Sequence, residues 1–248
     1  MSKIISCKVG NQIILLDIDR MEKEAGNREL WRAENYATLE PETIEWIDTF
    51  FQKGDVIYDI GANIGQYSLY AAKKLNKDCQ ILAFEPESLN YAKLNKNIVA
   101  NDLSEVITAY CLAISDKTSL SHFYVRKFAP GQALHSFGTK IGQDRKEFSP
   151  EHQQGMMGVS VDDLTQRFSL PFPTHIKVDV DGIESLIVKG ASNTLADVRL
   201  RSVLIEIYII QDVVSEIKEM FLGHDFVLSN ADSIKIKAGV TGNFIFTR

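Results

Sequence analysis

Residues 54–68 constrain the fold of this 248-residue chain more than any other stretch. Residues 56–60 are a short apolar run rich in β-forming side chains, as expected for a buried strand. Gly61 and Gly65 then bracket a tight turn, and apolar residues recur at helical spacing behind it. A strand that turns through glycines into a helix exposes backbone N–H groups and lets a ligand approach closely. The stretch therefore predicts an α/β fold with a ligand site at the turn.

Two acidic residues follow strand-like runs near this turn. Asp59 lies at the end of the first run, and Glu85 ends the next one, residues 81–84. Glu85 follows Gly65 by about 20 positions, the offset at which an acidic residue reaches a ribose hydroxyl in nucleotide-binding βαβ units. The alternative is the strand–turn–helix of a doubly wound protein without a ligand. The offset of Glu85 favours a site for an adenosine-containing ligand over that alternative.

Two common nucleotide-binding patterns are absent from the turn. A dinucleotide fingerprint needs G-x-G-x-x-G, but the middle position here is Asn63 and no third glycine follows. A P-loop needs a lysine after its last glycine, and Gly65 is followed by Gln66. The turn therefore fits neither a dinucleotide nor a triphosphate.

Residues 59–68, followed by residues 83–87, resemble the first two motifs of class I S-adenosylmethionine-dependent methyltransferases. More narrowly, they resemble the FkbM family. S-adenosylmethionine has no phosphate, so a turn with few glycines is tolerable, and its ammonium and sulfonium charges suit acidic neighbours. The resemblance implies S-adenosylmethionine as cofactor and S-adenosylhomocysteine as product. It implies cofactor contacts from Asp59, Gly61, Ala62, Asn63, Gly65, Tyr67, Ser68, Glu85 and Pro86.

A second cluster, residues 175–184, resembles the FkbM motif Ile-Lys-x-Asp-Val-Glu-Gly-x-Glu. Asp181 stands where the family more usually has Glu, which keeps the charge but shortens the reach by one methylene. The resemblance also implies that a third strand, residues 106–114, ends beside the adenine. Ala113 would then contact the ring, with Ser115 or Asp116 as hydrogen-bonding partners, although Asp116 fits a solvated turn nearly as well. Asp179 is predicted to contact the cofactor and also to take part in catalysis.

The resemblance implies a Rossmann-like α/β fold whose mostly parallel sheet is closed by an antiparallel strand. We expect residues 42–248 to form this methyltransferase domain, with residues 226–228 and 243–247 as the closing pair. Residues 126–158 are rich in Gly, Pro and charge, and we expect a long loop or lid there.

Residues 1–41 are expected to form a small extension. Two strand-like runs, residues 4–9 and 12–18, flank Gly10-Asn11, which predicts a hairpin with a type I′ turn. The charged stretch that follows carries Trp31 and predicts a helix over one edge of the main domain. Covering the substrate mouth is the less favoured alternative.

Composition bears on which functions and which cellular location to expect. The formal net charge of −6 argues against a non-specific nucleic-acid binder. The three cysteines are widely spaced and form no C-x-x-C, so neither a disulfide framework nor a zinc site is expected. No apolar run approaches ~18 residues and no signal peptide is evident. These features predict a cytoplasmic protein without a membrane span; a homo-oligomer is left open.

Five carboxylates fall at or near predicted strand ends, where α/β sheets bind ligands. About half of them are expected to cap loops or pair with cations. The preferred candidates for the base that accepts a hydroxyl proton are Asp179 and Asp181, then Glu206, with His135 of the long loop as a mobile base. Clustered carboxylates could instead hold Mg²⁺, and no metal ligand is assigned. His175, at the start of its strand, is expected to be structural.

The function predicted from these features is an S-adenosylmethionine-dependent O-methyltransferase. The resemblance implies that the acceptor is a hydroxyl of a sugar, glycan or other small molecule. One alternative is an NAD-dependent oxidoreductase of Rossmann type, and another is a non-catalytic module that binds S-adenosylmethionine. A nucleic-acid methyltransferase is less favoured, because the chain lacks an Asn-Pro-Pro-Tyr element and is acidic.

Overall fold

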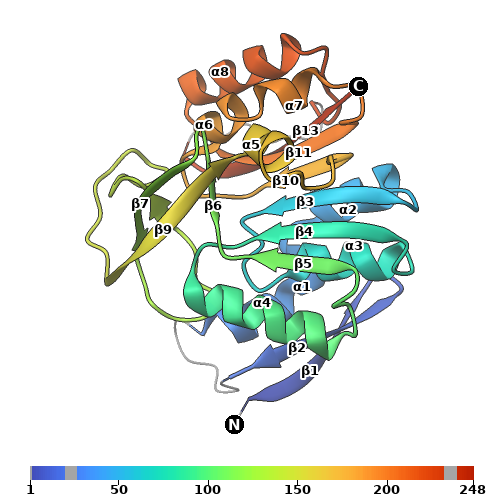
Figure 1. Cartoon of the computed structure of the whole chain (residues 1–248). Helices are drawn as coiled ribbons and strands as arrows, with labels where there is room; N and C mark the ends of the chain where they lie inside the picture. The colour runs from blue at the N-terminus through green and yellow to red at the C-terminus, as the bar shows by residue number, and fades with distance from the viewer. Residues whose placement is uncertain (1, 20–26, 232–238) are drawn as a thin grey trace.

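A computed structural model describes residues 2–19, 27–231 and 239–248, and it is built around one seven-stranded sheet (Figure 1). The strand order is β12-β13-β11-β10-β3-β4-β5. The strands are β3 (Asp55–Ile60), β4 (Cys79–Phe84), β5 (Ile107–Tyr110), β10 (His175–Val178), β11 (Ser202–Tyr208), β12 (Val227–Leu228) and β13 (Thr241–Thr247). Strands β11, β10, β3, β4 and β5 run parallel, and β13 pairs antiparallel with both β11 and β12. This confirms the predicted Rossmann-like sheet with its antiparallel closing strand.

The strand order reverses between β3 and β10, which makes their carboxyl ends the switch point where such sheets bind ligands. Ile60 pairs with Val178, so Gly61 and Asp179 lie side by side just beyond the sheet. A Cβ atom built on Gly61, whose φ is +84°, would lie 1.9 Å from the carbonyl oxygen of Asp179. The first glycine of the turn is therefore required both by its backbone conformation and by the approach of the neighbouring strand.

Two hydrophobic cores cover the two faces of the sheet, because successive side chains of each strand point to opposite sides. Ile57 belongs to the core shared with α1 (Arg28–Leu39), α2 (Pro41–Phe50), α3 (Gln66–Lys74) and α4 (Ser88–Ala100). Tyr58 and Ile60 belong to the core shared with α5 (Val161–Gln166), α6 (Glu184–Lys189), α7 (Ser192–Ala196) and α8 (Gln211–Leu222). Within the described ranges, no helix is both long and apolar enough to cross a membrane.

The predicted N-terminal hairpin is present as β1 (Lys3–Val9) and β2 (Gln12–Ile18), with Val9 paired to Gln12. Only Gly10 of the two turn residues has a positive φ, +54°, whereas a type I′ turn needs a positive φ at both. The predicted turn type is therefore wrong. Buried side chains of the hairpin share one core with α1, α3 and α4, so the extension is built into the fold (Figure 1).

The predicted third strand is in fact two strands. Strand β5 ends at Tyr110, and β6 (Ala113–Ser115) joins a separate four-stranded sheet of order β6-β9-β7-β8. The other members are β7 (Ser119–Val125), β8 (Ser136–Phe137) and β9 (His152–Ser160).

The prediction of one long loop over residues 126–158 is therefore wrong in part, since β8 and most of β9 fall within it. Glycine and glutamine in β9 weaken the local strand signal, and its pairing with β7 is a long-range contact. A Cβ atom on Gly158 would lie 2.5 Å from the ring of Phe137, so a glycine here makes room for this side chain of β8.

Candidate active site

A cavity of about 390 Å³ opens at the carboxyl ends of β3, β4, β10 and β11, within the size range of small-molecule sites. Its walls come from these strand ends, from α1 and from the segment Gln132–Phe137. It brings together nine of the residues predicted for the site: Gly61, Asn63, Glu85, Pro86, Ala113, His135, Asp179, Asp181 and Glu206. The strand-end carboxylates, far apart in the sequence, thus face one space.

Other predicted site residues lie behind the wall of the cavity rather than in it: Asp59, Ala62, Gly65, Tyr67, Ser68, Ser115 and Asp116. Asp59 is 3% exposed, and its Oδ2 accepts a hydrogen bond from Ser68 Oγ at 2.5 Å. Ser115 and Asp116 lie past the cavity because β6 carries the chain away into the second sheet. A direct contact of these two residues with the adenine is therefore not supported, whereas Ala113 and Ile114 do line the cavity.

The glycine turn and Glu85 are held together by backbone hydrogen bonds. The carboxyl of Glu85 accepts from the backbone N–H of Asn63 and from that of Glu87, each at 2.8 Å. Burial raises the pKa of Glu85 to about 8, although these two N–H groups act in the opposite direction. The side chain of Asn90 is a further hydrogen-bond partner of this carboxyl. The carboxyl is thus fixed in orientation at the cavity wall.

Lys177 forms the charged centre behind the strand ends. Its side chain is 2% exposed, with Nζ 2.6 Å from Asp179 Oδ2, 3.6 Å from Glu40 Oε2 and 4.8 Å above the ring of Tyr67. Although burial disfavours its charge, the neighbouring carboxylates of Asp179 and Glu40 raise the pKa of Lys177. Burial likewise opposes ionisation of Asp179, but the Lys177 ammonium holds the pKa of that carboxyl below its usual range. Asp179 is therefore an ionised carboxylate that already has a partner.

Asp181 and Glu206 have the opposite electrostatic surroundings. Burial, followed by the charge of Asp179, raises the pKa of Asp181 to about 7 and that of Glu206 to about 9. The Oδ2 atom of Asp181 accepts a hydrogen bond from the backbone N–H of Leu134 at 2.5 Å. Because a general base works best when its pKa lies near the working pH, Asp181 is the best matched of the three carboxyls.

His135 lines the cavity, but its contacts favour a donor rather than a base. The backbone N–H of Arg126 donates to Nδ1 at 3.1 Å, so a neutral ring carries its proton on Nε2. Burial, followed by the charge of Arg126, lowers the pKa of His135 to about 4. Among the described residues, Nε2 is buried and has no hydrogen-bond partner. The predicted mobile base is thus a fixed side chain, which can donate to a bound molecule.

The residues of α1 and the residue after it, Glu40, were not predicted to belong to the site. Arg28, Trp31, Arg32 and Glu40 line the cavity, together with the consecutive residues Gln132–Phe137. Arg32 is tied into the wall, since its Nε donates to the carbonyl of Gly131 at 2.9 Å and its Nη1 to Gln66 Oε1 at 3.4 Å. The extension therefore covers the mouth of the site, which was the less favoured expectation. Arg28 and Arg32 are one helical turn apart, and this spacing was the available signal.

No group of three or more His, Cys, Asp or Glu side chains in the described ranges is arranged to hold a metal ion. Asp179 is engaged by Lys177, and Asp181 by the backbone of Leu134, so their oxygens do not converge on one point. Mg²⁺ therefore stays a prediction without support from this geometry.

Sequence comparison relates the chain to three methyltransferases. It is 27% identical over 180 residues to the hexuronic acid methyltransferase AglP of Haloferax volcanii, covering 73% of this chain and 66% of that protein. It is 30% identical over 175 residues to the methyltransferase sdnD of Sordaria araneosa, covering 60% of this chain and 65% of that protein. It is 23% identical to the 31-O-demethyl-FK506 methyltransferase FkbM of Streptomyces tacrolimicus, over 71% and 74% of the two chains. The chain thus spans just under two thirds of the first two relatives.

Structural comparison supports the fold. A methyltransferase FkbM from Methylobacillus flagellatus KT matches 90% of this chain and 54% of its own, with a TM-score of 0.55 at 16% identity. A putative rRNA-methylase from Clostridium thermocellum matches 84% and 93%, with a TM-score of 0.52 at 10% identity. At such identities the likeness concerns the class I methyltransferase fold alone. The model of the methyltransferase FkbM domain, however, matches residues 59–228, more than half of the sequence. The chain therefore belongs to the FkbM methyltransferase family.

Proposed function

We propose that this protein is an S-adenosylmethionine-dependent O-methyltransferase that acts on a hydroxyl of a sugar or another small molecule. The observation that carries the proposal is the cavity at the switch point of the sheet, which is lined by the glycine turn, Glu85, Asp179 and Asp181 together. Family membership supports it, because FkbM methyltransferases generally use this cofactor. Family membership also argues against the alternative of an NAD-dependent oxidoreductase.

The residues present fit the cofactor. Glu85 is a buried carboxyl of fixed orientation at the cavity wall, and a carboxyl in this place suits a ribose hydroxyl. Leu112, Ala113 and Ile114 offer an apolar surface for the adenine. Arg32, fixed beside the first residue of α3, suits the carboxylate of the methionine half. When bound, the cofactor would supply a methyl group attached to a positively charged sulfur. The leaving group would be the neutral thioether of the demethylated cofactor.

The chain's own part in the transfer is to orient the acceptor hydroxyl, exclude water and take up a proton. Asp181 accepts the hydroxyl proton as the oxygen forms its bond to carbon. Asp179 stays ionised through its contact with Lys177, so it keeps its negative charge during the reaction. The segment Gln132–Phe137 closes the cavity from above, and the Nε2 proton of His135 orients the acceptor.

Relatives' names support a small hydroxylated acceptor, since one is a hexuronic acid methyltransferase and another a 31-O-demethyl-FK506 methyltransferase. A glycan or small-molecule acceptor is therefore our proposal for this chain too. A cytoplasmic location, a homo-oligomer and the lack of a nucleic-acid partner stay predictions from the sequence.

The proposal is tested by incubating the full chain with S-adenosylmethionine and a panel of sugars and secondary metabolites. Mass spectrometry should detect S-adenosylhomocysteine together with an acceptor that has gained one methyl group. Binding of S-adenosylmethionine without turnover across the panel would support the non-catalytic module instead. Binding of NAD without binding of S-adenosylmethionine would refute the proposal.

A further inference from the structure

Two arginines on one face of α1 distinguish the mouth of the cavity. Arg28 and Arg32 are the only Lys or Arg side chains among the described residues that line it. They are one helical turn apart, so they lie on the same side of the helix. The other charged lining residues are carboxyls, which makes the α1 wall the electropositive side of the site.

Arg32 is accounted for by its surroundings. It is half-buried, it is tied to Gly131 and Gln66, and its charge lowers the pKa of Asp179 and opposes the rise in that of Asp181. Its place beside the start of α3 matches the carboxylate end of the proposed cofactor. The cofactor has a single carboxylate, so it leaves Arg28 without an assigned role.

Arg28 occupies an unfavourable position for a cation. It is the first residue of α1, where the helix dipole favours negative charge and opposes a guanidinium. Arg28 is exposed, and its Cζ lies 4.5 Å from the ring centre of Trp31, which is itself 38% exposed. An anion bound at this point would be favoured both by Arg28 and by the start of the helix. The exposed indole next to it offers a flat apolar surface with a polar edge.

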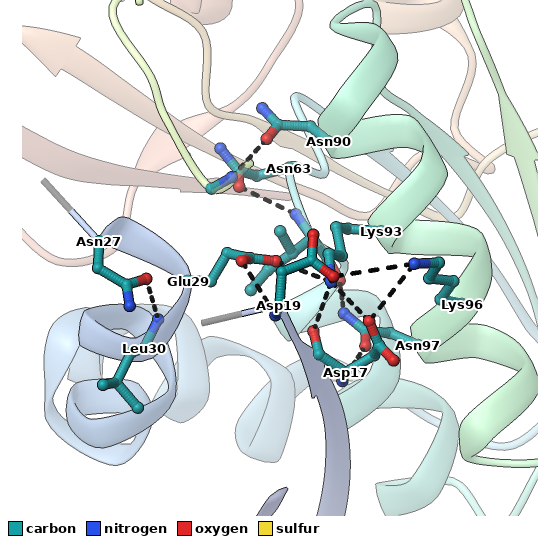
Figure 2. A network of polar contacts seen from close by, with 12 residues as sticks. Asp17, Asp19, Asn27, Glu29, Leu30, Asn63, Asn90, Lys93, Lys96 and Asn97 are labelled. Carbon is teal, nitrogen blue, oxygen red and sulfur yellow. Dashed lines mark hydrogen bonds and ion pairs between the residues drawn. The ribbon is translucent and has the colours of Figure 1, made fainter. Parts of the chain in front are cut away.

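A buried ion cluster fixes the first turn of α1 (Figure 2). Lys93 of α4 is 2% exposed, and its Nζ lies 2.5 Å from Asp17, 2.7 Å from Asp19 and 3.1 Å from Glu29. Glu29 is the residue between Arg28 and the rest of the helix, and its Oε2 also accepts from the backbone N–H of Asp19. The cluster joins α1 to the hairpin and to α4, so Arg28 and Trp31 project from a rigid platform.

The loop over the cavity rests on the same turn. Gly131 has a φ of +76°, and a Cβ atom there would lie 2.9 Å from the backbone nitrogen of Glu29. Asn90 of α4 accepts from the backbone N–H of Gly131 at 2.7 Å and donates to the carbonyl of Gln132 at 3.1 Å. Asn63 of the glycine turn also donates to that carbonyl, at 2.8 Å. The mouth of the site is therefore preorganised by α1, the loop and the turn together.

We propose that Arg28 and Trp31 recognise the acceptor, and that the acceptor is a sugar bearing a carboxylate. This rests on the proposed function, since it concerns the acceptor half of the same site. The planar guanidinium of Arg28 pairs with the carboxylate, and the indole of Trp31 packs against the apolar face of the sugar ring. A singly charged carboxylate fits better than a phosphate dianion, because the carboxyls of Asp179 and Asp181 line the same cavity.

The test compares two sugars that differ only at C6, p-nitrophenyl β-D-glucuronide and p-nitrophenyl β-D-glucoside. Calorimetry on the full chain saturated with S-adenosylhomocysteine should show the glucuronide binding at least about tenfold more tightly. Arg28→Gln should abolish this preference and leave the dissociation constant of S-adenosylmethionine within about twofold. Trp31→Ala should weaken the binding of both sugars.

Arg167→Gln is the matched control. Arg167 is another exposed arginine near an aromatic ring, 5.7 Å from that of Phe168, and it does not line the cavity. It should change neither the sugar preference nor cofactor binding. Thermal melting of each variant checks that the fold is intact.

Undetectable glucuronide binding, equal binding of the two sugars, or a preference that survives Arg28→Gln would overturn the assignment. A tenfold loss of S-adenosylmethionine affinity in Arg28→Gln would place Arg28 at the cofactor and overturn it as well. Tighter binding of glucose 1-phosphate than of the glucuronide would exclude the carboxylate. These outcomes are distinct from failure of the proposed function, which would appear as a wild-type chain that does not bind the cofactor.

Discussion

Clusters of ionisable side chains lie at both ends of the central sheet. The groups at the amino end are paired with one another, whereas the carboxyl end has more carboxyls than cations. At the amino end, His175 Nε2 lies 3.0 Å from Asp55 Oδ2, and its Nδ1 lies 2.6 Å from Ser202 Oγ. Trp46 donates from Nε1 to the same hydroxyl at 2.9 Å, and Arg201 pairs with Asp55. At the carboxyl end, carboxyls outnumber cations and face a cavity.

The amino-end cluster has the partners of a Ser-His-Asp triad without the access that catalysis needs. Ser202 and His175 are 0% and 1% exposed. The imidazole is stacked on Phe51, with ring centres 4.4 Å apart. Because these side chains are buried and hydrogen-bonded to one another, the cluster points to a role in stability. This agrees with the structural role predicted for His175.

The carboxyl-end cluster is left with excess negative charge. Lys177 is the buried cation among Glu40, Asp59, Asp179 and Glu206, and the pKa of each of these carboxyls except Asp179 is raised, first of all by burial. Groups held away from their ordinary ionisation state are costly to a fold and are typical of functional sites. The contrast indicates that one end of the sheet serves stability and the other serves chemistry.

Asp181→Asn should produce the largest effect on activity. The amide oxygen can still accept from the N–H of Leu134, so the loop should keep its place while the proton acceptor is lost. We expect turnover with the best acceptor of the panel to fall about 10²–10⁴-fold, with cofactor affinity unchanged. Asp116→Asn, outside the cavity, is the control. A loss of less than about tenfold would remove Asp181 from the chemistry.

Asp55→Ala should produce the largest effect on stability. It leaves the buried His175 and the partly exposed Arg201 without their shared carboxylate, and a buried hydrogen-bonding group left without its partner costs about 1–3 kcal/mol. Urea unfolding measures the loss, and the folded fraction should retain its turnover. Lost turnover at unchanged stability would contradict the division between the two ends.

Glu85→Ala should weaken binding of S-adenosylhomocysteine by about 1–3 kcal/mol, because hydrogen bonds from the ribose to the carboxyl are lost. Fluorescence titration or calorimetry measures this loss. The exposed Glu105→Ala is the comparison variant, since Glu105 lies outside the cavity. An unchanged dissociation constant would exclude Glu85 from the cofactor site.

The pH dependence of stability should differ in sign between the two ends. Burial opposes ionisation of Asp55, but the contact with His175 lowers its pKa, so its contribution to stability is present near neutral pH and lost as the pH falls. The pKa of Glu206 is raised from 4.5 to about 9, so the folded state holds a proton that the unfolded state has released. Its contribution is therefore present at low pH and lost as the pH rises toward 9.

Glu206→Gln measures the carboxyl-end part of this difference. Relative to wild type, its free energy of unfolding should increase steadily from mildly acidic to alkaline pH, because the neutral amide releases no proton. Asp55→Asn should show its deficit chiefly above acidic pH. If the free energies of unfolding of the two variants changed with pH in the same way, the proposed electrostatic difference between the two ends of the sheet would be contradicted.

Much of the carboxyl end was predictable from the sequence, and the reason is local. The glycine turn, Glu85 and the strand ending in Asp179 are short motifs whose geometry follows from a strand, a turn and a parallel neighbour. The contributions of α1 were not predictable, because they depend on Lys93 meeting Glu29 and Asp17 from distant parts of the chain. The role of His135 likewise depends on one backbone contact, from Arg126.

The central claim is that the cavity between the glycine turn and the acidic strand ends holds the nucleoside half of a methyl donor. A crystal structure with S-adenosylhomocysteine tests it most directly. We predict ribose hydroxyls within hydrogen-bonding distance of the Glu85 carboxyl, the adenine against Ala113, and the amino-acid tail beside Arg32. Density for the ligand elsewhere, or no ligand in crystals grown at saturating concentration, would contradict the account.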